Sequence, residues 1–79
     1  MLEGRTMRTN MRAERVRNGL TAAEAAESIG VNANALLRWE TGEAEPLAGN
    51  LLKLAKLYGC SPEYLLEQTS DRHGKAVAV

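Results

Sequence analysis

Apolar residues recur at three- and four-residue spacing over most of the chain, which is the pattern of amphipathic helices. Between residues 21 and 29 these positions carry mostly small side chains, whereas between 32 and 41 Leu36 and Trp39 carry large ones. A longer repeat of leucine and alanine spans residues 47–58, with Lys53 and Lys56 on its outer side. No stretch alternates as a strand does. The pattern predicts an all-α domain.

Capping residues define the boundaries of the two central helices. Thr21, followed three residues later by Glu24, forms a capping box, and Gly30 supplies the left-handed conformation that a sharp helix–helix turn requires. Asn32 can cap the next helix, which runs to about residue 41 and ends at Gly42. Two short helices joined in this way form a helix-turn-helix.

Three further helices complete the expected domain. The first covers residues 10–18, with Thr9 or Asn10 as its cap and Met11 and Val16 as its few apolar residues. The fourth covers residues 47–58. The fifth is capped by Ser61, and its apolar face consists of Tyr64, Leu65 and Leu66. We therefore expect a flexible basic arm over residues 1–8, a compact five-helix domain over 9–68 and a flexible tail over 69–79.

The charge of the chain is balanced overall but unevenly distributed. Ten Lys and Arg residues offset ten Asp and Glu residues in 79, so no global field attracts the protein to a polyanion. Residues 1–17, however, contain five arginines against two glutamates. This distribution argues against a bulk polyanion binder and remains compatible with a reader that has a local basic face.

The reactive residue types do not form a catalytic or metal-binding set. Cys60 is the only cysteine and follows Gly59 in an apolar context, which indicates a small buried side chain. His73 lies in the expected tail, with no cysteine or second histidine near it. We expect a non-enzyme without metal or cofactor. The absence of a transmembrane-length apolar run or a signal-peptide pattern predicts a cytoplasmic protein without membrane contact.

The motifs between residues 10 and 66 resemble the lambda-repressor-like, Cro/C1-type helix-turn-helix family, also called the XRE family. They are RVRNGLT, AAESIGVNANALLRWETG, a proline four residues after that glycine, and LLKLAKLYGCSPEYLL. The resemblance implies a five-helix DNA-binding domain whose third helix enters the major groove of double-stranded DNA. It also implies a transcriptional regulator, in particular a repressor, that binds a palindromic operator as a homodimer.

The resemblance also assigns roles to individual residues. An Arg–Glu salt bridge between the first and third helices corresponds here to Arg15 and Glu40. The positions that read bases are Asn32, Ala33, Asn34, Leu37 and Arg38. The positions that contact phosphates are Arg17, Thr21, Ala22 and Thr41, and the dimer interface is expected at Tyr64, Leu65 and Leu66.

Several of these positions depart from the family pattern. Ala22 replaces a common glutamine, and Leu37 replaces a longer polar side chain. Glu43 and Glu45 stand in the loop where basic residues often meet phosphate, so we expect weak DNA affinity. These departures keep an alternative open, in which the same fold is a protein-interaction module such as an antitoxin or a partner-binding regulator.

Overall fold

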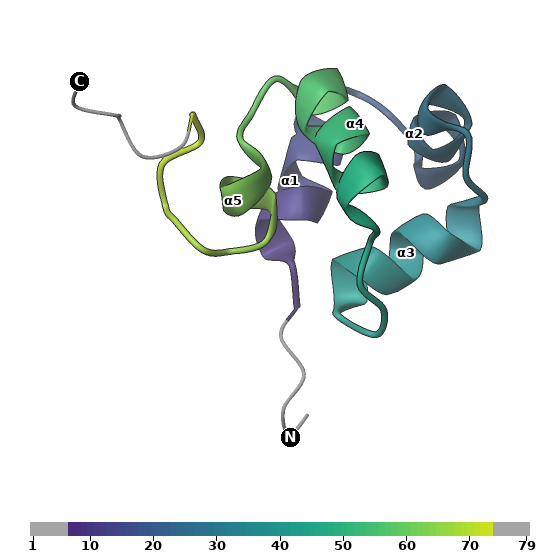
Figure 1. The fold of residues 1–79 in the computed structure, drawn as a ribbon. Helices are drawn as coiled ribbons and strands as arrows, with labels where there is room; N and C mark the ends of the chain where they lie inside the picture. Colours follow the sequence, from purple (N-terminus) through teal and green to yellow (C-terminus); the bar gives the residue numbers. More distant parts are fainter. Residues whose placement is uncertain (1–6, 74–79) are drawn as a thin grey trace.

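The computed structural model describes residues 7–73, which form five helices and no strand. The helices are α1 (Thr9–Arg17), α2 (Ala22–Ile29), α3 (Ala33–Thr41), α4 (Ala48–Tyr58) and α5 (Pro62–Leu65). In Figure 1, α2 and α3 lie on one side of α4, and α1 and α5 lie on the other. The predicted all-α, five-helix architecture is confirmed. None of the described helices is both long and apolar enough to cross a bilayer.

The helix-turn-helix forms because each helix end has a local partner. The Thr21 hydroxyl accepts a hydrogen bond from the Glu24 N–H, and the Glu24 carboxylate accepts one from the Thr21 N–H. Gly30 has a φ of 80°, a left-handed backbone conformation that residues other than glycine adopt only at a cost in free energy. Asn32 caps α3, and Gly42 ends it. The predicted capping box, turn and helix ends are therefore confirmed.

The core lies where the inward faces of the helices meet. Met11, Leu36, Leu54 and Leu65 are fully buried, one from each of four helices. Ala25 and Ala26 of α2 are also buried, and such small side chains allow neighbouring helices to pack closely. Trp39 is 6% exposed and belongs to this core, as its place on the inward stripe predicted.

The first helix differs from the prediction in its cap and in its packing. It begins at Thr9, one residue early, and the side chain at its N-cap position makes no capping hydrogen bond. The N–H of Asn10 instead donates to the Glu67 carboxylate at 2.6 Å, while the Asn10 side chain donates to the Tyr64 carbonyl. Val16 is 59% exposed and contributes little to the core. A residue distant in sequence thus caps α1, which local capping rules cannot detect.

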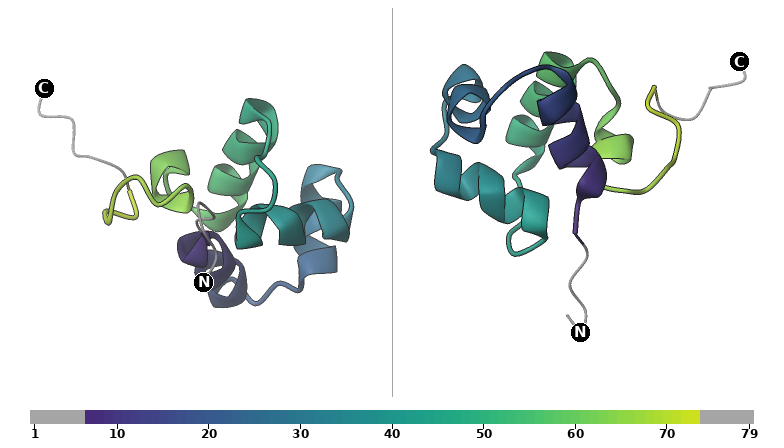
Figure 2. Two further views of the ribbon diagram at one scale, coloured as in Figure 1. Left: turned by 90° about the horizontal axis from the view of Figure 1, so that it is seen from below. Right: turned by 180° about the vertical axis from the view of Figure 1, so that it is seen from behind.

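The prediction of flexible chain ends is wrong for two arginines. Arg8, placed in the arm, is 6% exposed and bonds to the end of α3 and the loop after it. Arg72, placed in the tail, binds the Glu14 carboxylate of α1. Seen from behind in Figure 2, α1 lies between α3 and α5 and contacts both. Residues 1–6 of the expected arm and 74–79 of the expected tail lie outside the described residues.

Candidate nucleic-acid interface

The outer face of α3 presents three exposed side chains. Asn34, Leu37 and Arg38 point away from the core, while Leu36 and Trp39 of the same helix are buried. Leu37 is 41% exposed, so part of its apolar surface is accessible between Asn34 and Arg38. The Asn34 amide can form hydrogen bonds with adenine, and the Arg38 guanidinium can form them with guanine. The Leu37 side chain between them can contact a thymine methyl group.

The two residues at the start of α3 are less available. Asn32 accepts a hydrogen bond from the Ala35 N–H at 2.8 Å through its side-chain oxygen. Because that oxygen is engaged in capping, the side-chain NH2 group of Asn32 is what remains to donate to another partner. Ala33 is half-buried and packs against the core. The free polar groups of α3 are therefore those of Asn34 and Arg38.

The residues expected to contact phosphate lie around the ends of α2 and α3. The start of α2 presents the first N–H groups of a helix, a setting that favours anions. The Thr21 side chain is exposed there, whereas Ala22 is half-buried. Glu24 places a carboxylate at the same helix end, which opposes a phosphate. At the end of α3, Thr41 is half-buried, and its hydroxyl donates to the Arg38 carbonyl at 3.2 Å.

Arg15 and Glu40 join α1 to the end of α3 in a bidentate pair. Arg15 Nε lies 2.7 Å from Glu40 Oε2, and Nη2 lies 3.1 Å from Oε1. The side chains are 12% and 4% exposed, and the Arg15 Nη1 group also donates to the Leu20 carbonyl. The hydrogen bond to Glu40 raises the pKa of Arg15, so the guanidinium stays charged. This planar fork fixes the orientation of α3 relative to α1.

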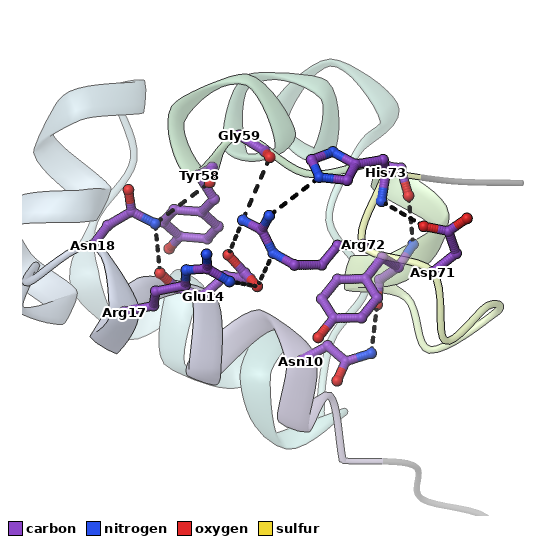
Figure 3. Close-up of polar contacts among 11 residues, drawn as sticks. Asn10, Glu14, Arg17, Asn18, Tyr58, Gly59, Asp71, Arg72 and His73 are labelled. Atoms are coloured by element: carbon purple, nitrogen blue, oxygen red, sulfur yellow. Dashed lines mark hydrogen bonds and ion pairs between the residues drawn. The ribbon is translucent and has the colours of Figure 1, made fainter. Parts of the chain in front are cut away.

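A second buried carboxylate, Glu14, ties α1 to the C-terminal segment (Figure 3). Arg72 Nε lies 2.8 Å from Glu14 Oε2, and Nη2 lies 2.9 Å from Oε1. Arg17, an expected phosphate contact, has a 61% exposed side chain and lies 3.9 Å from Glu14. The hydrogen bond from Arg72 lowers the pKa of Glu14 despite its burial. Arg17 thus forms a longer ion pair with Glu14, and most of its side chain stays exposed.

The expected dimer residues of α5 divide into two groups. Leu65 is fully buried in the monomer core, so its assignment to the interface is wrong. Tyr64 and Leu66 are half-buried and keep part of their surface outside the core. The helix is only four residues long, and a single inward position is enough to close the core beneath it.

The sulfur and histidine side chains of the described residues form no site. Cys60 is half-buried, and burial raises the pKa of its thiol to about 11. It is therefore protonated at neutral pH and a poor nucleophile. Residues 7–73 contain no group of three or more metal-ligating side chains.

Most of the chain matches a known protein family. The family model described as Helix-turn-helix matches residues 11–65, which include the complete core and the exposed face of α3. The chain belongs to the Cro/C1-type helix-turn-helix family. The resemblance found in the sequence motifs is thereby confirmed.

Two curated relatives from this helix-turn-helix family are similar over most or half of the chain. Repressor protein C2 of Salmonella phage P22 is 39% identical over 61 residues, which are 77% of this chain and 28% of the repressor. An uncharacterized HTH-type transcriptional regulator of Haemophilus influenzae is 42% identical over 43 residues, covering 54% of this chain and 18% of the regulator. The chain spans less than a third of the length of either relative.

Two solved structures share the helix-turn-helix fold at higher coverage. The crystal structure of the P22 c2 repressor in complex with a synthetic operator superposes with a TM-score of 0.74 and 37% identity, over 82% of this chain and 98% of that one. The solution structure of the P22 c2 repressor DNA-binding domain gives a TM-score of 0.69 and 32% identity, over 94% and 100% of the two chains.

Proposed function

We propose that this chain is a sequence-specific DNA-binding repressor whose α3 helix enters the major groove. The observation that carries the proposal is the exposed face of α3, with Asn34, Leu37 and Arg38 held outward by the buried Leu36 and Trp39. The scaffold that presents this face matches the P22 c2 repressor, which was solved in complex with an operator. A rigid helix on a packed core is what direct readout of base edges requires.

The chemistry of the face suggests which bases it reads. Arg38 can donate two hydrogen bonds to guanine, and Asn34 can form a bidentate contact with adenine. Leu37 and the methyl group of Ala33 can pack against thymine methyl groups. Asn32, engaged as a helix cap, acts chiefly by fixing the start of α3, with its amide group available to a phosphate or base edge.

Backbone contacts would position the domain on the duplex. Arg17, Thr21, the N–H of Ala22 and Thr41 are the proposed phosphate partners. Arg17 and Arg38 supply the cations, and Glu24 reduces the attraction at the start of α2. With few cations on this face, we expect weak binding by a monomer and a shallow dependence on salt.

Two domains reading a palindrome would double the contacts and the specificity. We propose that a homodimer forms through the C-terminal side of the domain, where Tyr64 and Leu66 remain partly exposed. The regulator would act in the cytoplasm, where operator DNA is accessible, and without an enzymatic step or cofactor.

The test is a selection from a random-oligonucleotide pool at two salt concentrations, followed by titration of the enriched sequence. We expect an enriched sequence with two-fold symmetry, and Arg38→Ala should abolish its preferential binding with helicity unchanged. Lys53→Ala, on the outer side of α4, is the matched control and should bind as the parent protein does. If no sequence is enriched even at low salt, the proposal fails.

The alternative of a protein-interaction module on the same fold is not favoured. Its support was the neutral charge of the chain and the short, Ala-rich recognition surface. In the acidic loop that would also face a protein partner, Glu45 is paired with Arg8. The relative that aligns over 77% of the chain is a repressor, which agrees with DNA as the partner.

A further inference from the structure

The guanidinium of Arg8 joins three groups at the C-terminal end of α3. Its Nη1 donates to the Trp39 carbonyl at 2.7 Å and to the Ala44 carbonyl at 3.1 Å. Its Nη2 lies 2.6 Å from the Glu45 carboxylate. The Arg8 N–H also donates to the Glu40 carbonyl at 2.8 Å. One residue thus holds the last turn of α3 and the α3–α4 loop together.

This arrangement suits the physical needs of a helix end. The last carbonyls of a helix lack partners within it and carry a partial negative charge, which a nearby cation stabilises. Arg8 is 6% exposed, so its charge is well shielded from water and its geometry is fixed by several partners. A solvated surface arginine would not be held in this way.

The same contact changes the charge of the loop. Glu43 and Glu45 are exposed in the loop that follows α3, and the Glu45 side chain is 76% exposed. If Glu45 had no partner, its carboxylate and that of Glu43 would both repel a phosphate backbone bound along α3. The Arg8 guanidinium balances the charge of Glu45 from its buried side.

We propose that Arg8 is a positioning residue for DNA binding, which neutralises Glu45 and fixes the α3–α4 loop beside the recognition helix. The inference rests on the proposed DNA-binding function. Arg8 itself touches no base in this scheme, because its guanidinium is already engaged by the three acceptors. Its role is to make an acidic loop compatible with a polyanion.

The test uses four variants in DNA titrations at several salt concentrations: Arg8→Gln, Glu45→Gln, the double variant, and Lys56→Gln. Lys56 is an exposed lysine in the last turn of α4, and that end of the helix lies away from α3 in Figure 1. Its variant is the control for loss of one positive charge. Circular dichroism and thermal melting check that each variant is folded under the binding conditions.

We expect Arg8→Gln to weaken binding about fivefold, the factor for one like-charge contact at close range in water. The double variant has the net charge of the parent and should recover to within about twofold of it. Glu45→Gln should tighten binding, because it removes a carboxylate beside the bound phosphates and leaves the positive charge of Arg8 unbalanced. Lys56→Gln should have little effect.

Three results would overturn the inference: Arg8→Gln binding as the parent does, no recovery in the double variant, or an equal loss in Lys56→Gln. If Arg8→Gln does not fold, Glu45→Gln decides, because unchanged affinity in that variant would exclude the role. A parent protein without sequence preference refutes the proposed function instead. The two failures are thus distinguishable.

Discussion

Replacing Arg15 by methionine removes the guanidinium that bridges α1 and α3 but keeps much of the apolar side chain. Glu40 would then remain 4% exposed without the two hydrogen bonds that it accepts at 2.7 and 3.1 Å. An uncompensated buried charge is costly, whereas replacing both partners of such a pair by apolar residues is often neutral. Arg15→Met should therefore lose much more stability than the small change in buried apolar surface alone would predict.

The magnitude follows from the burial of both partners. Breaking a buried pair by removing one partner costs about 3–5 kcal/mol, against about 0–1 kcal/mol for an exposed pair. Arg15 retains some exposure, so we expect a loss near 3 kcal/mol. In a domain of this size that corresponds to a fall in melting temperature of more than about 10 °C.

Thermal and urea denaturation followed by circular dichroism measure this loss. The set is Arg15→Met, Glu40→Leu and the double variant, because the double variant leaves no buried charge. We expect the double variant to be more stable than Arg15→Met. A shift below about 4 °C for Arg15→Met, or strict additivity of the two single effects, would show that the pair acts as two solvated charges.

Three further outcomes are expected. Tyr58→Phe should leave stability unchanged or raise it by about 1 kcal/mol, since its buried hydroxyl has no hydrogen-bond partner among residues 7–73; a clear loss in thermal melting would reveal a partner. Gly30→Ala should cost about 1–2 kcal/mol from its φ of 80° alone, because a Cβ there meets no atom within 4 Å; Gly30→Asn should cost less in the same melts. Arg72→Met should reduce the fall in stability on acidification, measured by urea unfolding between neutral and acidic pH.

The sign of the Arg72 effect follows from the pKa of Glu14. The hydrogen bond from Arg72 lowers the pKa of Glu14 in the folded state below its ordinary value of 4.5. The pair therefore contributes its full stability above the unfolded-state pKa, and the contribution is lost as the pH falls through the folded-state pKa. Equal pH profiles for Arg72→Met and the parent protein would contradict this linkage.

The exposed face of α3 could be predicted from the sequence because it depends on periodicity within one short helix. Leu36 and Trp39 define the inward stripe, and Leu37 and Arg38 fall outside it. The engagement of Asn32 as a cap was also readable, since its partner is only three residues away. The burial of Leu65 was not, because Tyr64, Leu65 and Leu66 are all apolar and a four-residue helix gives no usable period.

By itself the sequence determined the helix-turn-helix, since its signals act over three or four residues: the Thr21 capping box and the left-handed glycines that end α2 and α3. The tertiary structure alone decided what holds the N-terminal end of α1 and its Glu14 side chain. Its N-terminal cap comes from Glu67, 57 residues away, and the partner of its Glu14 comes from Arg72, 58 residues away. The spacing of charged residues along the sequence does not predict which distant residue each one will pair with. Only the folding of the C-terminal segment onto α1 brings them within hydrogen-bonding distance.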